Sequence, residues 1–170
     1  EIALAEGYIV QLHEMSEKDD FKSIITRTFR KVLLEIDRVE QAKSLLKKAF
    51  RVLKSVTLTI PEVGDVSLDL ESMMGLGDSG NFQSDLVDLV ESIGNAAKEY
   101  GKFVCILIDE TQYVDEESLA ALVAASHRVS QKNLPVVFIC AGLPQILALT
   151  GDAKSYAERL FEFIKINGLS

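Results

Sequence analysis

The chain has 170 residues, of which 48% are hydrophobic and 26% charged, a composition typical of one soluble globular domain with a hydrophobic core. Its formal net charge of −8 argues against broad binding of nucleic-acid phosphates, because such binding needs clustered Lys and Arg side chains. No apolar run approaches the roughly 20 residues of a membrane-spanning helix, and no secretory signal opens the chain, so no membrane contact and a cytoplasmic location are expected.

The first half of the chain predicts alternating helical and extended segments. Gly7 has the position of a glycine that closes a helix, and Ser16 with Asp19 resembles a capping pair ahead of apolar residues at helical spacing. The expected elements, in chain order, are the end of a helix over 1–7, a strand over 8–12, helices over 21–32 and 39–54, and a β-hairpin with a loop as an insertion over 55–80.

The second half predicts buried parallel strands joined by helices. Residues 103–108 and 134–140 are continuous apolar runs without alternation, as expected of strands that are covered on both faces. The expected elements are a helix between Asn81 and Gly101, a strand over 103–108, a helix opened by Asp115, a strand over 134–140, short helices over 144–149 and 153–161, and a last strand over 163–166. This alternation predicts a three-layer α/β/α fold around a parallel sheet.

The acidic pair Asp109 and Glu110 is the strongest candidate for a functional site. It directly follows the first apolar strand, and active groups of open α/β sheets collect at the carboxyl ends of the strands. One carboxylate there can hold the shell of a Mg²⁺ ion while its neighbour polarises an attacking water. Acidic residues also begin many ordinary loops, and the dipeptide alone leaves the two interpretations nearly even.

Three segments of the C-terminal part together resemble the AAA+ ATPases, in particular the bacterial and archaeal ATP-binding proteins related to origin-recognition initiators. They are Ile-Leu-Ile-Asp-Glu-Thr-Gln at 106–112 as a Walker B strand, 134–145 as a sensor 1 strand, and Tyr-Ala-Glu-Arg-Leu-Phe at 156–161 before a final strand. The resemblance covers most of 101–170 and is loose before it. It implies a P-loop NTPase-like fold that uses ATP and Mg²⁺.

The resemblance assigns roles to four residues. Asp109 corresponds to the acid that holds Mg²⁺ through water, and Glu110 corresponds to the general base. Arg159 resembles the arginine that reaches a γ-phosphate, often across a subunit boundary, although an ordinary surface arginine is an equal alternative. Gln145 is the first side chain after the sensor 1 strand that can bind phosphate or water, because Ala-Gly at 141–142 occupies the usual polar position.

Gln112 has two interpretations from the sequence. It can steer a loop near the nucleotide, or it can be a solvated loop glutamine. Neither interpretation is favoured by a spacing rule, and the second is the commoner case for a glutamine that follows a strand end.

The phosphate-binding loop is the notable omission from the sequence. No segment of the 170 residues matches G-x-x-x-x-G-K-[ST], whose backbone N–H groups and lysine surround the β- and γ-phosphates. The expectation is therefore that 1–170 is a partial ATPase core without its first strand and phosphate loop, inactive alone and prone to self-association through exposed sheet edges. A DNA or protein partner of the longer protein is possible. The alternative function is a nucleotide-dependent switch or a protein-interaction scaffold with little hydrolysis.

Overall fold

A parallel three-stranded sheet is the centre of the fold. The computed structural model describes residues 1–40, 49, 52–53, 81–143 and 161–166. Its strands are β1 (Ile9–Glu14), β2 (Val104–Asp109) and β3 (Val136–Cys140), and they lie in the order β1-β2-β3 with every pair parallel. The prediction of an α/β fold with a parallel sheet is therefore confirmed, with β2 as the central strand.

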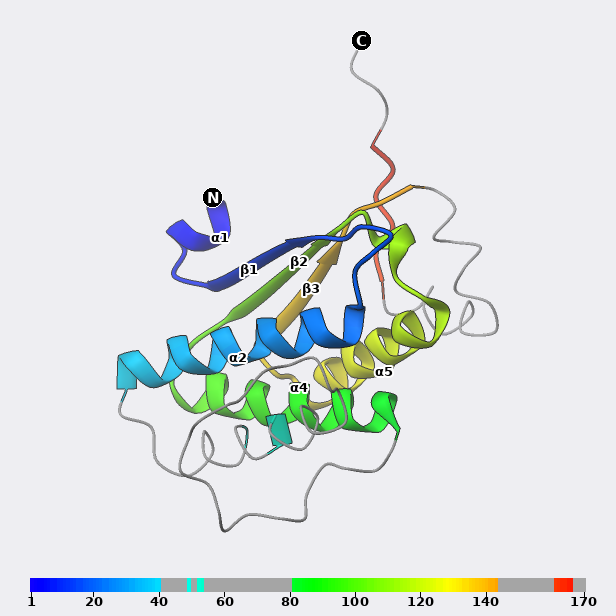
Figure 1. Cartoon of the computed structure of the whole chain (residues 1–170). Coiled ribbons are helices and arrows are strands. Elements are labelled where there is room, and N and C mark those ends of the chain that lie inside the picture. The colour runs from blue at the N-terminus through cyan, green and yellow to red at the C-terminus, as the bar shows by residue number, and fades with distance from the viewer. Residues whose placement is uncertain (41–48, 50–51, 54–80, 144–160, 167–170) are drawn as a thin grey trace.

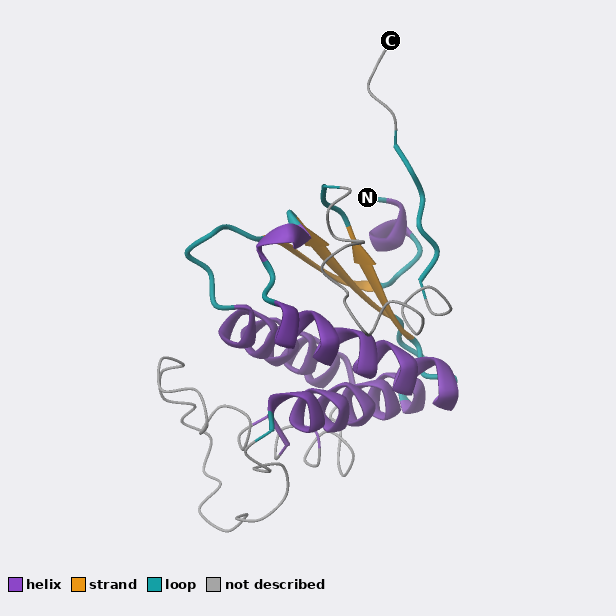
Figure 2. Ribbon diagram, turned by 90° about the vertical axis from the view of Figure 1, so that its right-hand side faces the viewer, coloured by secondary structure: helices purple, strands orange, loops and turns teal. Residues whose placement is uncertain are grey.

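Helices connect these strands. They are α1 (Ile2–Ala5), α2 (Phe21–Glu40), α4 (Phe82–Glu99) and α5 (Glu116–Lys132), with a short 3₁₀ helix η1 (Thr111–Tyr113) between β2 and α5. Figures 1 and 2 show α2, α4 and α5 side by side on one face of the sheet. The described residues thus form two layers, the sheet and one layer of long helices.

The strand order explains why the predicted third layer is not seen in this part of the chain. Each crossover from one parallel strand to the next is right-handed, and here the chain moves across the sheet in a single direction. Crossovers of the same hand and the same direction place all connecting helices on the same face. A second helical layer requires the strand order to reverse, and the described strands contain no reversal.

The helix ends are closed largely as the sequence predicts. Gly7 has a φ of 79° and its N–H donates to the Leu4 carbonyl at 3.1 Å, so it closes α1. The side chain of Asn81 caps α4 by accepting from the Ser84 N–H at 3.2 Å, and Gly101 follows the helix with a φ of 61°.

The start of α2 differs from its prediction. Asp19 does accept hydrogen bonds from the N–H and the hydroxyl of Ser16, both at 2.8 Å, but these bonds close a turn before the helix. The helix itself begins with Asp20, which accepts from the Ser23 N–H at 2.9 Å. The sequence prediction took the pair of Ser16 and Asp19 as the helix start, whereas Asp20 makes the capping contact directly before Phe21.

The hydrophobic core lies between the sheet and the helical layer. On β2, the side chains of Val104, Ile106 and Ile108 are at most 3% exposed. Phe138 of β3 meets Phe29 of α2 edge to face, with ring centroids 6.4 Å apart. Apolar residues of α4 and α5 complete the core, among them Leu86, Leu89, Ile93, Leu122 and Val129.

The other face of the sheet is apolar and largely open. The strand register places Leu12, Leu107 and Ile139 beside one another on it. Leu12 is 71% exposed and Ile139 is 49% exposed, and Val137 of the same face is 42% exposed. The prediction that both apolar strands are covered on both faces is wrong for β3, whose Val137 and Ile139 are exposed here. On this face of β2, Cys105 is buried and Leu107 is partly exposed. We call Leu12, Leu107, Val137 and Ile139 the open face.

Several other predictions can be compared with the structure. Residues 161–166 include no strand, so the predicted last strand is wrong there; the N–H and C=O groups of a strand need a partner strand, and no described strand lies along this segment. Cys105 is buried and Cys140 is exposed, and both are free thiols. No helix among the described residues is long and apolar enough to cross a membrane.

Some predictions lie outside the described residues. They are the hairpin and loop over 55–80, the short helices over 144–149 and 153–160, and most of the helix over 39–54. Of that last helix, the structure describes residues 39 and 40, which are the end of α2 and not a separate element, and residues 49, 52 and 53, which are helical and buried.

A close approach between α4 and the start of β3 allows a test of the packing. A Cβ added at Gly94 would lie 2.8 Å from the Leu134 Cβ, which is fixed to the backbone. We expect Gly94→Ala to lower the free energy of unfolding by about 1–2 kcal/mol, because overpacking outweighs the better helix propensity of alanine. Chemical denaturation measures this change.

Two further variants check the cause. Leu134→Ala in the Gly94→Ala background should cost less than Leu134→Ala alone, because it removes Cδ1 and Cγ of Leu134, which would lie 2.8 and 3.2 Å from the new Cβ, although the Cβ contact remains. Asp88→Ala, at an exposed position of the same helix, should change stability by less than about 0.5 kcal/mol. Additive effects of Gly94→Ala and Leu134→Ala would contradict the proposed contact.

Candidate functional site

The end of β2 carries the acidic pair to the surface. Ile108 is 3% exposed and belongs to the core, whereas the next residue, Asp109, is exposed and Glu110 is half-buried. The Asp109 carbonyl accepts from the Met15 N–H at 3.0 Å, which joins the segment after β1 to this point. Asp109 lies beside Glu14 in the strand register, so two carboxylates occupy neighbouring strand ends.

Glu110 has an unusual backbone conformation. Its φ of 53° and ψ of 39° are left-handed, which L-residues other than Gly, Asn and Asp rarely adopt. Its N–H donates to Asp109 Oδ1 at 2.8 Å, and its carbonyl accepts from the Tyr113 N–H at 3.0 Å at the start of η1. The chain therefore turns sharply at Glu110, immediately after the strand.

Thr111 joins this turn to the end of β3. Its N–H donates to the Ala141 carbonyl at 3.0 Å, and its hydroxyl lies 2.8 Å from the same oxygen and 3.1 Å from the Ile108 carbonyl. The Ala141 N–H in turn donates to the Ile108 carbonyl at 2.9 Å. With a side chain that is almost wholly buried, Thr111 keeps the two strand ends together.

Gln112 makes a second connection between the same two segments. Its Nε2 donates to Oε2 of Glu110, and its Oε1 accepts from the Leu143 N–H at 3.1 Å. These contacts do not fit a freely solvated glutamine, whereas the role of steering a loop near a nucleotide stays a prediction. The side chain connects the acidic turn with the segment that follows β3.

The carboxylates at this edge suit a cation that keeps most of its water. The described residues contain no group of three or more His, Cys, Asp or Glu that could hold a metal ion directly. Mg²⁺ needs no such group, because it commonly binds through one or two carboxylates together with substrate phosphates and waters. Asp109, exposed at the strand end, fits that kind of contact.

Two of the four predicted site residues fall outside the part of the chain that the structure describes. Asp109 and Glu110 are adjacent at the end of β2, as predicted, whereas Gln145 and Arg159 have no described position. Thr111 was not predicted from the sequence. Residue type and spacing do not distinguish a buried threonine that binds another strand end from an exposed threonine in a turn.

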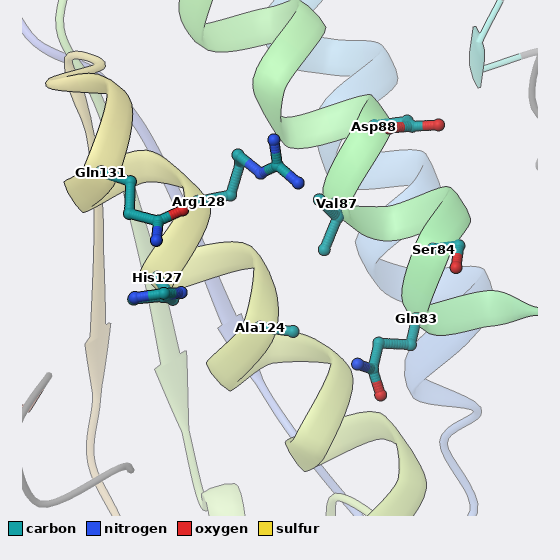
Figure 3. A pocket seen from close by; sticks show the side chains of 8 residues that line it. All are labelled: Gln83, Ser84, Val87, Asp88, Ala124, His127, Arg128 and Gln131. Carbon is teal, nitrogen blue, oxygen red and sulfur yellow. The ribbon is translucent and has the colours of Figure 1, made fainter.

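The groove between α4 and α5 is separate from the strand ends. It has a volume of about 600 Å³ and is lined by Gln83, Ser84, Val87 and Asp88 from α4 and by Ala124, His127, Arg128 and Gln131 from α5 (Figure 3). Arg128 forms an ion pair with Glu91 at 3.4 Å, and Lys132 also pairs with Glu91. The guanidinium therefore already has an acidic partner, which it shares with Lys132, and the candidate site remains the acidic edge of the sheet.

Comparison of the chain with protein-family models, with curated proteins and with solved structures gives no significant match.

The strained turn at Glu110 generates a stability prediction. We expect Glu110→Gly to be more stable than Glu110→Ala by about 1 kcal/mol, because glycine adopts left-handed angles without steric cost. Both variants lose the carboxylate, so their difference isolates the backbone. Thermal and chemical unfolding of the two variants measure it.

Glu117 provides the matched control. It lies in the first turn of α5 with helical geometry, and both of its variants lose the same ion pair with Lys22. There alanine should be the more stable substitution by up to about 1 kcal/mol. The same sign at both positions would show that the conformation of Glu110 carries no strain.

Proposed function

We propose that the chain is part of an ATP-hydrolysing domain of the AAA+ type, in which the end of β2 supplies the acidic half of the active site. The observation that carries the proposal is the position of Asp109 and Glu110 at the carboxyl end of the central parallel strand. In this role Asp109 holds the water shell of Mg²⁺, and Glu110 takes the proton of the attacking water.

The architecture supports this proposal in two ways. A parallel sheet with β2 between two neighbours is compatible with a P-loop NTPase-like core, in which nucleotides bind at the carboxyl ends of strands. The turn after β2 also holds Glu110 half-buried beside Asp109 instead of letting its side chain move freely in solvent. A general base must be positioned in this way to act on a bound water.

The phosphate-binding loop must come from outside these 170 residues in this proposal. Backbone N–H groups and a lysine would then hold the β- and γ-phosphates across from Asp109. Gln145 and Arg159 keep their proposed roles toward the γ-phosphate. We propose that the 170-residue chain alone binds Mg·ATP weakly and hydrolyses none.

Replacement of the proposed base provides the test. In the full-length protein, Glu110→Gln should retain ATP binding and lower turnover by about 100-fold or more, because the amide cannot accept the proton. Steady-state hydrolysis and equilibrium binding of Mg·ATP measure the two properties. Glu35→Gln, which removes an exposed carboxylate from α2, should leave both unchanged.

Normal turnover by Glu110→Gln would exclude the proposed mechanism. A second candidate, a nucleotide-dependent switch with little hydrolysis, is favoured by the absence of a polar side chain at Ala141 and Gly142 after β3. Single-turnover measurement on the full-length protein separates the two functions. A chemical step that is slow even with saturating ATP would identify the switch.

We also propose that the chain alone self-associates through its sheet. The open face presents Leu12, Val137 and Ile139 to solvent, and contiguous exposed apolar surface commonly marks an interface. Ile139→Glu should shift sedimentation velocity profiles at high concentration toward the monomer. Leu34→Glu, on the exposed side of α2, should leave them unchanged, and a wild-type chain that stays monomeric would contradict the proposal.

A further inference from the structure

Gln112 has one contact to an acceptor and one to a donor, and the amide side chain satisfies both. Its two partners are a carboxylate of Glu110, which can only accept, and a backbone N–H of Leu143, which can only donate. The chemistry of the partners therefore requires the amide nitrogen toward Glu110 and the amide oxygen toward Leu143. Glutamate in this position would lack the donor, and lysine would lack the acceptor.

The backbone around Glu110 is held separately from its side chain. Thr111 connects the turn to Ala141 through both its N–H and its hydroxyl. These bonds fix the peptide, but the position of the Glu110 carboxylate depends on the side-chain torsions beyond Cα. Among the described residues, Gln112 is the side chain that donates to this carboxylate, through Oε2.

The segment after β3 can therefore influence the acidic turn directly. Leu143 is 50% exposed, and its backbone N–H holds the far end of the Gln112 amide. Displacement of Leu143 either breaks its hydrogen bond with the Gln112 amide or rotates that amide. The Glu110 carboxylate then loses the donor that holds it. One rigid planar group joins the two positions, so the effect needs no longer chain of contacts.

We propose that Gln112 is a positioning residue that couples the Glu110 carboxylate to the backbone of the segment after β3. Movement of that segment, by a bound ligand or a neighbouring domain, changes the position of the carboxylate. The link itself stands on the geometry of the described residues. Its consequence for hydrolysis rests on the proposed function.

Amide hydrogen exchange tests the link without ATP. In the 170-residue chain, Gln112→Lys should raise the exchange rate of the Leu143 amide about tenfold, because lysine keeps a donor for Glu110 and removes the acceptor. Gln112→Glu should raise this rate less, about threefold, because it retains an acceptor oxygen for Leu143 but loses the donor that binds Glu110. Glu110→Ala should raise Leu143 exchange about threefold, although Glu110 makes no hydrogen bond with Leu143, because the amide loses its other partner.

Reference amides and a control variant separate coupling from unfolding. Exchange at Leu143 is compared with exchange at Val123, which is buried in α5, so that a general loss of stability raises both rates. Glu14→Ala removes a nearby charge without touching Gln112 and should leave Leu143 at the wild-type rate. Wild-type exchange at Leu143 in either Glu110→Ala or Gln112→Lys would overturn the proposal.

Hydrolysis by the full-length protein tests the consequence. Gln112→Glu should lower kcat about tenfold and leave KM for ATP within twofold, because a second carboxylate displaces Glu110 without touching the nucleotide. An unchanged kcat in a protein whose Glu110→Gln variant is inactive would overturn the positioning role. If Glu110→Gln itself turns over normally, the proposed function fails, and the exchange measurements still decide whether the link exists.

Discussion

Burial of the helix-facing side of β2 is the constraint on which the other features depend. Val104, Ile106 and Ile108 are covered by the helical layer, and the strand that carries them pairs with both of the other described strands. Such a strand cannot continue into a charged residue without bringing that charge to solvent, because an unpaired buried carboxylate is strongly unfavourable. The acidic pair therefore marks the point where the strand leaves the core.

Burial of β2 also determines which segments lie around its carboxyl end. Once β2 is fixed, the segments after β1 and β3 must pass the point where Asp109 emerges, and both bind there through backbone groups. Thr111 and Gln112 add side-chain bonds to the segment after β3. The proposed catalytic role of Glu110 and the proposed coupling through Gln112 are thus two properties of one turn, one chemical and one mechanical.

The sequence predicted those features that depend on local pattern. Continuous apolar runs identified β2 and β3, and Asn81 and Asp115 identified the starts of α4 and α5. It failed at the start of α2, where two local hydrogen-bond patterns compete and Asp20 makes the capping contact. It also failed for Ile139, because the exposure of a side chain on an edge strand depends on what covers that strand. No run of residues records which strand lies at an edge.

The candidate site likewise contains residues that the local sequence pattern identifies and contacts that it does not identify. Asp109 and Glu110 could be found because a buried strand followed by acids is visible in the sequence. The bond between Gln112 and Leu143 joins residues that are far apart in the chain, and its donor is a backbone N–H that any residue type supplies. Gln145 and Arg159 remain predictions that come from resemblance.

The order of the strands also bears on how the chain folds. Between α4 and β3, the contacts join elements that are close in the sequence: α4 packs against α5 in the most extensive pairing of helices, β2 pairs with β3, and α5 contacts β3. The strand β1 pairs with β2 only after a long intervening stretch of chain has been closed into a loop, which costs conformational entropy before any contact is gained. We expect residues 82–140 to reach their native arrangement first and β1 to join last, so that the carboxylate of Glu14 arrives at an acidic turn that is already formed.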